Sequence, residues 1–354
     1  MTPYATLQSA ADRRLPPGPS RRLWFEIGRF VDEGSLLYEA WRLGRADESA
    51  LRRRAARYQA AVEVLEARGL LAEPSPLFPA PRELPPIERK AMRIAGVSAF
   101  DSIRYASNPV SVFPASMATA ARDPGGRNRL AYAYLWRHGD RGRRTIVCIH
   151  GYRGGFAALD GRAFEVQRLF LEAGLDVALA ILPYHGPRTP DGSVSGQPFL
   201  NDPRRTLEAV AQGIHDLRVL VSWLRHDGAG PVGVAGFSLG GYMTALLASV
   251  EPGLAFAAPI IPVASFADLL WERSGRRGEH EAARAAGMSL ELFRKLFTPH
   301  CPLDHRPLVD RERRLVIAGE ADRIAPPEHA AALAAHWQTE VEWFPGGHLA
   351  QLGR

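Results

Sequence analysis

The chain has 354 residues, of which 46% are hydrophobic and 23% are charged, close to the averages of ordinary globular proteins. These proportions exclude a disordered or fibrous protein, and the 33 glycines and 28 prolines fall short of a low-complexity composition. The formal net charge is +6, but the arginines are scattered, and even the run Arg52 to Arg54 lies among acidic residues. We therefore expect a solvated surface of mixed charge and no nucleic-acid partner.

The cysteine content and the N-terminal residues indicate the cellular compartment of the protein. Cys148 and Cys301 are the only cysteines, and they form no CxxC pair, so neither a disulfide framework nor a zinc ribbon is indicated. Residues 1–20 carry Asp12 and two arginines where a signal peptide would be apolar. The longest apolar run, 253–267, is shorter than the roughly 20 residues that cross a bilayer. We expect a soluble, cytoplasmic protein without a membrane span.

The first quarter of the chain differs from the rest. Apolar residues recur at helical spacing from residue 22 to about residue 71, which predicts two or three helices. Six prolines then follow between residues 74 and 86, a composition that favours extended chain and is the best linker candidate. We expect an N-terminal helical extension with a Pro-rich linker over residues 1–95 and a separate domain over 96–354.

After the linker, short β-rich runs alternate with helical patterns, which is typical of a mostly parallel sheet with helices on both faces. The central runs, 145–149 and 177–182, are continuously apolar, as expected of strands that are covered on both faces. The sequence therefore predicts the α/β class with an eight-stranded sheet. The expected strands are 102–105, 130–136, 145–149, 177–182, 232–235, 255–261, 314–318 and 341–344.

One segment carries the chemistry. Residues 236–240 read Gly-Phe-Ser-Leu-Gly, directly after an apolar strand and before a helix-compatible run. A serine on such a sharp strand-to-helix turn is held in a strained conformation that exposes its Oγ, and Gly236 and Gly240 leave room for the flanking chain. The alternative is an ordinary glycine-rich turn with an incidental Ser238. The context before and after the turn favours a nucleophile.

At these residues the chain resembles the α/β-hydrolase superfamily, and the resemblance covers about residues 97–354. It implies a nucleophile, an acid and a histidine in that order along the chain, the last two after late strands. Ser238, Asp322 and His348 match that order. His348 would act as the base for Ser238, and Asp322 would hold its tautomer. The other carboxylates that could serve as the acid are Glu320, Asp304 and Asp268.

The resemblance also implies an oxyanion hole made of two backbone N–H groups. These would be Leu239, after the nucleophile, and Tyr152, in the loop 150–155 that resembles the superfamily's oxyanion loop. A second loop, 183–188, should reach the same end of the sheet, where ligands bind in open α/β folds. In that loop Tyr184, His185 and Arg188 either contact substrate or brace the loop, and the sequence leaves both readings open.

The segment 265–302 has two helical patterns and predicts a small cap, with a plain connection as the alternative. His300, Cys301 and His305 lie close together in it, but a single cluster without a second spaced pair does not predict a metal site. Only six residues follow His348, where the superfamily fold usually closes with a helix. We therefore expect the helices within 22–71 to pack back on the body, although they could instead serve dimerisation or substrate entry.

These features together predict a serine hydrolase, and most specifically a carboxylesterase that forms an acyl-enzyme on Ser238. Its partner would be a small-molecule ester or other acyl substrate, and the chemistry requires no cofactor. A peptidase or amidase, a thioesterase and an acyltransferase would use the same three residues, so they remain open. A function of another class, a ligand-binding protein on a hydrolase scaffold, would normally have lost one of the three.

Overall fold

A computed structural model of the protein describes residues 19–43, 47–94, 98–117, 123, 125–276 and 280–354. The chain forms two compact units. The unit that we call the Ser238 unit consists of Ser75–Ala258 and Pro307–Arg313. The other, the His348 unit, combines Met1–Pro74, Pro259–Arg306 and Arg314–Arg354. Residues 1–18, where the sequence predicts no signal peptide, lie outside the described residues.

The Ser238 unit contains strands in the order β1-β2-β3-β5-β4-β6. Pairing is antiparallel from β1 through β3 to β5, whereas β4 is parallel to both β5 and β6. All residues of β4, β5 and β6 are buried, as the continuous apolar runs predicted. The sequence analysis missed β1, because four of its five residues are exposed and show no apolar pattern. The strands are β1 (Glu88–Met92), β2 (Phe100–Ala106), β3 (Leu130–Trp136), β4 (Thr145–Ile149), β5 (Asp176–Ile181) and β6 (Val232–Phe237).

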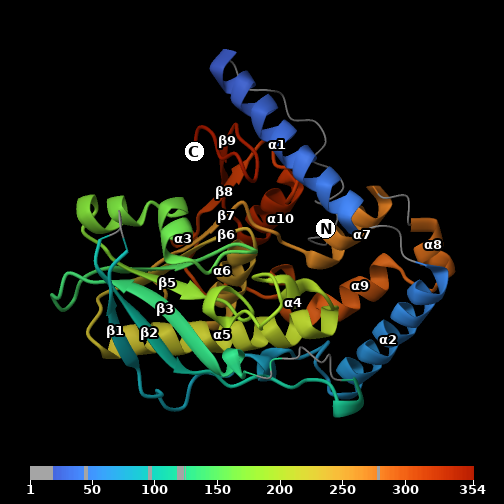
Figure 1. Ribbon diagram of the computed structural model, residues 1–354, viewed down its shortest axis with the longest axis horizontal. Helices are drawn as coiled ribbons and strands as arrows, with labels where there is room; N and C mark the ends of the chain where they lie inside the picture. Colours follow the sequence, from blue (N-terminus) through green and yellow to red (C-terminus); the bar gives the residue numbers. More distant parts are fainter. Residues whose placement is uncertain (1–18, 44–46, 95–97, 118–122, 124, 277–279) are drawn as a thin grey trace. The chain divides into compact units, whose positions relative to one another are not determined.

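Helices cover both faces of these strands, and Figure 1 shows α3 (Ala157–Ala163) and α5 (Pro203–His226) on opposite sides of β3 and β5. The start of α5 follows ordinary capping rules, because the Asp202 side chain accepts the N–H of Arg204. Next along the chain, α6 (Leu239–Val250) packs against β6 and β4. The remaining helical segments of this unit are α4 (Gln197–Leu200), a π-helical turn (Arg168–Glu172) and the 3-10 turns Ser75–Leu77, Ala115–Met117, Arg127–Arg129, Gly186–Arg188 and Arg311–Arg313.

The His348 unit contains parallel strands from the end of the chain. Ile260 in β7 (Ala257–Ile260) pairs with Ile317 in β8 (Val316–Gly319), and β8 pairs in turn with β9 (Val341–Phe344). Between the last two strands, α10 (Pro327–Trp337) packs against β8. With the parallel strands of the Ser238 unit, this arrangement confirms the predicted fold class: an α/β fold with a mostly parallel sheet.

The N-terminal helices and the predicted cap belong to the same unit. The chain forms the two expected N-terminal helices, α1 (Pro19–Leu43) and α2 (Glu48–Ala67). The buried face of α2 packs against α8 and α9, with the Tyr58 ring edge-on to that of Phe293 at 5.8 Å (Figure 1). The segment predicted as a cap forms α7 (Phe266–Arg276), α8 (His280–Ala285), α9 (Leu290–Phe297) and the 3-10 turns Thr298–His300 and Pro302–Asp304.

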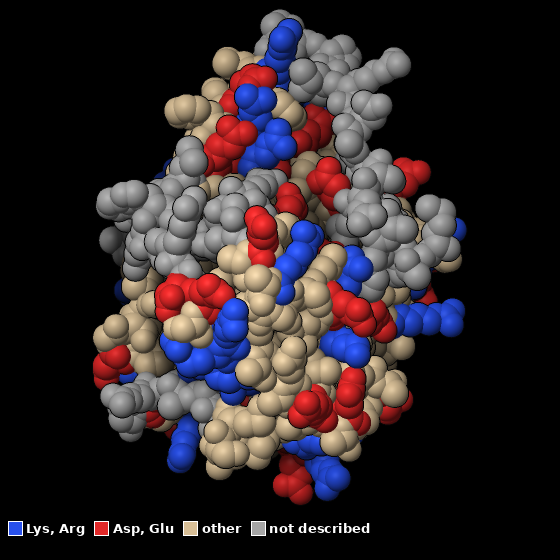
Figure 2. All heavy atoms as spheres, turned by 90° about the vertical axis from the view of Figure 1, so that its right-hand side faces the viewer, with Lys and Arg blue, Asp and Glu red and all other residues tan. Residues whose placement is uncertain are grey.

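Charged side chains of both signs are interspersed on the face drawn in Figure 2. Many arginines have acidic neighbours on their own helix: Arg52 lies 2.7 Å from Glu48, and Arg29 lies 3.7 Å from Glu33. Such local pairs reduce the field that the arginine excess produces. None of the helices in the described ranges is long and apolar enough to cross a bilayer.

Candidate functional site

Ser238 sits between β6 and α6 in a strained backbone conformation, with φ 54° and ψ −111°. Positive φ is unfavourable for a residue with a side chain, and it persists here because the turn is enclosed by close backbone contacts. A Cβ on Gly240 would lie 1.9 Å from the carbonyl oxygen of Ile149, and one on Gly236 would lie 2.2 Å from that of Gly240. Both glycines are therefore required by the geometry, and the turn has the form of a nucleophile elbow.

The loop that follows β4 lies against this elbow. A Cβ on Gly151 would be 3.5 Å from Ser238 Cβ and 3.3 Å from the carbonyl oxygen of Phe237. Tyr152 is half-buried in this loop, whereas Leu239 is buried in the first turn of α6. The two backbone N–H groups predicted to stabilise an oxyanion, those of Tyr152 and Leu239, thus belong to the loop after β4 and to α6, the two segments next to Ser238.

A buried histidine anchors the start of this loop. The N–H of Leu182 donates to His150 Nε2 at 3.1 Å, so Nδ1 carries the ring proton and donates it to the carbonyl of Gly151 at 2.8 Å. His150 is fully buried, and burial lowers its pKa, which keeps the ring neutral. These bonds fix the carbonyl of Gly151, next to the predicted donor Tyr152.

The other end of the loop is held by Asp160, a residue that the sequence analysis did not single out. One of its carboxylate oxygens accepts the N–H groups of Gly155 at 2.7 Å and Phe156 at 2.6 Å. Asp160 lies on α3 and is almost fully buried. No residue-type pattern marks such a contact, because the donors are backbone groups that every residue except proline offers.

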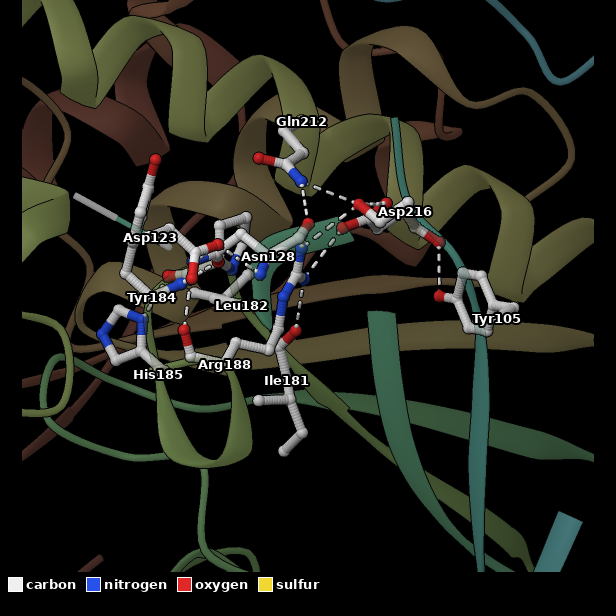
Figure 3. Close-up of polar contacts among 12 residues, drawn as sticks. Tyr105, Asp123, Asn128, Ile181, Leu182, Tyr184, His185, Arg188, Gln212 and Asp216 are labelled. Carbon is white, nitrogen blue, oxygen red and sulfur yellow. Dashed lines mark hydrogen bonds and ion pairs between the residues drawn. The ribbon is translucent and has the colours of Figure 1, made fainter. Parts of the chain in front are cut away.

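Three residues of the loop 183–188 were predicted to contact substrate or brace the loop. Tyr184 is half-buried, whereas His185 and Arg188 are fully buried. Arg188 is fully buried and donates to Asp216 at 2.8 Å and to the carbonyl of Ile181 at 3.1 Å (Figure 3). His185 is also fully buried, its Nδ1 lies 2.8 Å from the carbonyl oxygen of Pro183, and burial holds its pKa well below the usual range. For both residues these contacts favour the bracing alternative.

Tyr184 is the half-buried member of the three. Its backbone has φ 65°, an uncommon conformation for a bulky side chain, and its N–H donates to Asn128 Oδ1 at 2.7 Å. Burial raises the pKa of its phenol, which therefore stays neutral at ordinary pH. Tyr184 is thus the least enclosed of the three predicted residues of this loop.

Asp322 and His348 lie together in the His348 unit. His348 Nδ1 is 2.7 Å from Asp322 Oδ2, and the two side chains are 7% and 1% exposed, respectively. The other oxygen of Asp322 accepts the N–H groups of Ile324 at 2.9 Å and Ala325 at 2.7 Å. Asp322 follows β8 and His348 follows β9. The Asp322 carboxylate is thus fixed by backbone donors, and it can hold the imidazole of His348 in one tautomer.

The three alternative acids have other surroundings. Glu320 lies 3.3 Å from the guanidinium of Arg21, and Asp268 lies 2.6 Å from that of Arg294. Asp304 is exposed at the surface. Two of these carboxylates are thus paired with arginines and the third lies at the surface, which favours Asp322 as the partner of the histidine.

The histidine and cysteine side chains that we weighed as metal ligands from the sequence have other partners. His305 Nε2 lies 3.1 Å from the carbonyl oxygen of Pro299, while the buried Cys301 contacts that of Ala264. His300 is fully buried, and burial lowers its pKa to about 3. Within the described ranges, no three His, Cys, Asp or Glu side chains are grouped so as to hold a metal ion.

The strand order, the elbow at Ser238 and the acid and histidine after late strands together define an α/β-hydrolase fold. The family model for "Alpha/beta hydrolase domain containing 18" matches residues 124–268. An uncharacterised protein of Mycobacterium tuberculosis, MT2702, is 34% identical over 303 residues, which are 82% of this chain and 69% of that protein. A second protein of that species, Rv2627c, is 38% identical over 228 residues, which are 62% of this chain and 53% of that protein.

Solved structures share the architecture. An acetyl xylan esterase from a Thermoanaerobacterium species matches with a TM-score of 0.52 at 16% identity, over 86% of this chain and 94% of that one. An acetyl xylan esterase from a Paenibacillus species matches equally, over 81% and 88% of the two chains. The chain therefore belongs to the α/β-hydrolase superfamily.

Proposed function

We propose that the chain is a serine hydrolase, and specifically a carboxylesterase that works through an acyl-enzyme. Ser238 Oγ attacks the ester carbonyl while His348 Nε2 takes the hydroxyl proton, and the N–H groups of Leu239 and Tyr152 stabilise the oxyanion. The imidazolium then returns the proton to the leaving alkoxide. Water, deprotonated by His348 in the same way, hydrolyses the acyl-enzyme and restores Ser238.

The observation that carries this proposal is the strained backbone of Ser238 at the strand-to-helix turn, with φ 54°. Such a conformation is costly and is commonly found where it serves a function. The buried pair of His348 and Asp322, 2.7 Å apart, supports the assignment of the base, because Nδ1–H donates to the acid and Nε2 is then the unprotonated ring nitrogen, which can accept a proton. The chain order of serine, acid and histidine agrees with this mechanism.

An ester is the acyl substrate that we propose, since ester hydrolysis is the activity named for the two solved proteins of similar fold. Amides and thioesters pass through the same tetrahedral intermediate, so they belong in the same substrate panel. Tyr184 is the residue of loop 183–188 that we assign to substrate contact, and the helices α7 to α9 are the segment that we assign to a cap.

Labelling with a fluorophosphonate probe tests the nucleophile. The native protein is expected to gain one phosphonyl group on Ser238, whereas Ser238→Ala should gain none and His348→Ala should react far more slowly. Ser249→Ala, which removes another hydroxyl of the same helix α6, serves as the matched control and should label like the native protein. Intact-mass and peptide mass spectrometry measure the outcome. An unlabelled native protein, or labelling of Ser238→Ala to the native extent, contradicts the proposal.

A further inference from the structure

Helix α1 places a buried carboxylate against the segment that carries His348. Asp32 has an exposure of 0%, although it lies on a helix whose neighbouring residues Val31 and Glu33 are exposed. One of its oxygens accepts the N–H of His348 at 2.7 Å and that of Arg323 at 3.1 Å. Its other oxygen accepts the N–H of Leu349 at 3.0 Å.

The backbone of α1, and not only the Asp32 carboxylate, lies close to the segment before His348. A Cβ on Gly28 would lie 2.2 Å from the backbone nitrogen of Gly347, and one on Gly347 would lie 2.7 Å from both Asp32 Oδ2 and the carbonyl oxygen of Gly28. Gly28 and Asp32 are four residues apart, so they lie on the same face of α1. This face is therefore fitted to the turn before His348, and side chains larger than glycine are excluded from the contact.

These contacts link residues far apart in the chain, and the hydrogen bond from His348 is buried. Burial raises the pKa of Asp32, and the three backbone N–H groups act in the opposite direction by stabilising its charged form. Within the described part of the chain, the hydrogen bonds to this carboxylate come from backbone groups. A carboxylate that accepts backbone N–H groups from two loops fixes the position of both loops, and here one of them carries the predicted base.

We propose that Asp32 is a positioning residue for His348. By accepting the N–H groups of His348 and Leu349, it fixes the backbone from which the imidazole extends toward Asp322. The Gly346–Gly347 pair before His348 gives this constraint a role, because two adjacent glycines leave that backbone freer than other residues would. The inference rests on the proposed function for its catalytic consequence. Its structural content, the hold of Asp32 on His348, can be tested separately.

The first test compares Asp32→Asn with Glu33→Gln. Both substitutions remove one carboxylate from α1 with little change of shape, but the Glu33 side chain is 49% exposed and contacts arginine side chains. If the amide oxygen of an asparagine keeps the bonds to His348 and Arg323, its NH2 group must face the N–H of Leu349, and the repulsion of these two donors displaces the backbone next to His348. Asp32→Asn is expected to lower kcat for p-nitrophenyl acetate by about 10- to 100-fold with KM nearly unchanged, because small misplacement of a catalytic group slows the chemical step. Glu33→Gln should keep native values.

Proton NMR gives a readout that does not need turnover. The Nδ1–H of His348, hydrogen bonded to Asp322, should give a far-downfield resonance that His348→Ala removes. Asp32→Asn is expected to shift or broaden this resonance, whereas Glu33→Gln should leave it unchanged. Because this signal does not depend on Ser238, it tests the hold on His348 even if the fluorophosphonate experiment disproves the serine mechanism.

A second pair of variants covers the case in which Asp32→Asn does not fold. Gly28→Ala inserts a methyl group against Gly347, whereas Gly34→Ala adds the same group to the same helix with no atom within 4 Å. We expect Gly28→Ala to reduce kcat and perturb the resonance and Gly34→Ala to match the native protein. Native kcat and a native resonance in Asp32→Asn, or in Gly28→Ala where Asp32→Asn is unfolded, would overturn the proposal.

Discussion

Replacement of Asp322 by asparagine is expected to lower kcat/KM by about 10⁴-fold, the scale seen when a catalytic histidine is held in the wrong tautomer. Asp322 Oδ1 already accepts two backbone N–H groups, from Ile324 and Ala325. The amide oxygen of an asparagine would keep that place, so its NH2 group would face His348 Nδ1. The ring proton would then move to Nε2, which could no longer accept the proton of Ser238.

The opposite amide orientation is the less favourable one. It would turn NH2 toward two buried N–H donors, and each group left unsatisfied costs about 1–3 kcal/mol. The loss in Asp322→Asn should therefore arise from the tautomer, with the fold preserved. The rate of p-nitrophenyl acetate hydrolysis and the rate of fluorophosphonate labelling should fall together, while near-UV circular dichroism stays native.

Glu320→Gln is the matched control for the acid. It removes a carboxylate two residues earlier, one that faces Arg21 at 3.3 Å, and it should change kcat/KM by less than about twofold, because the partly buried ion pair that is lost does not hold His348. If Glu320→Gln lost activity and Asp322→Asn kept it, the acid would be Glu320 and our assignment would be wrong.

A second large effect is expected on stability, from the buried ion pair in Figure 3. Arg188 and Asp216 are joined at 2.8 Å, and the two side chains are 0% and 6% exposed. Asp216→Ala would leave the guanidinium charge of Arg188 buried without its partner, which typically costs about 3–5 kcal/mol in the free energy of unfolding. The same guanidinium bonds Ser107 Oγ and the carbonyl of Asn128, so these contacts would loosen as well.

Urea unfolding, followed by circular dichroism, measures this cost. Asp191→Ala serves as the control, because Asp191 forms an ion pair with Arg127 at 2.6 Å but is 76% exposed, and it should cost less than about 1 kcal/mol. The double substitution Arg188→Met with Asp216→Leu should recover much of the loss, since it removes both buried charges. Equal costs for Asp216→Ala and Asp191→Ala would show that the pair contributes little.

Much of the fold and part of the candidate site could be predicted from the sequence, because their signals are local. The apolar strand before Ser238, the glycines around it and the helix after it lie within twenty residues, and the strained turn packs against β4 and the start of the loop after it. The positions of Asp322 and His348 after late strands followed from chain order. The structure then brought these two side chains to 2.7 Å.

The tertiary structure decided what no local pattern encodes. The sequence left open whether Arg188 binds substrate or braces its loop, and the contacts with Asp216 and with the carbonyl of Ile181 favour the second interpretation. The edge strand β1 escaped detection because its side chains face solvent. The sequence analysis missed Asp160 and Asp32 for another reason. Their partners are backbone N–H groups, which are the same in every residue type except proline.

Asp32 shows this limit most clearly, since 316 residues separate it from His348. By itself, the sequence predicted which chemistry to propose for the chain, because the nucleophile, acid and base that we propose are side chains of recognisable type at recognisable turns. The tertiary structure determined how the histidine is held. A carboxylate binds whichever backbone N–H groups the fold presents to it, and that presentation exists only once distant segments have packed together.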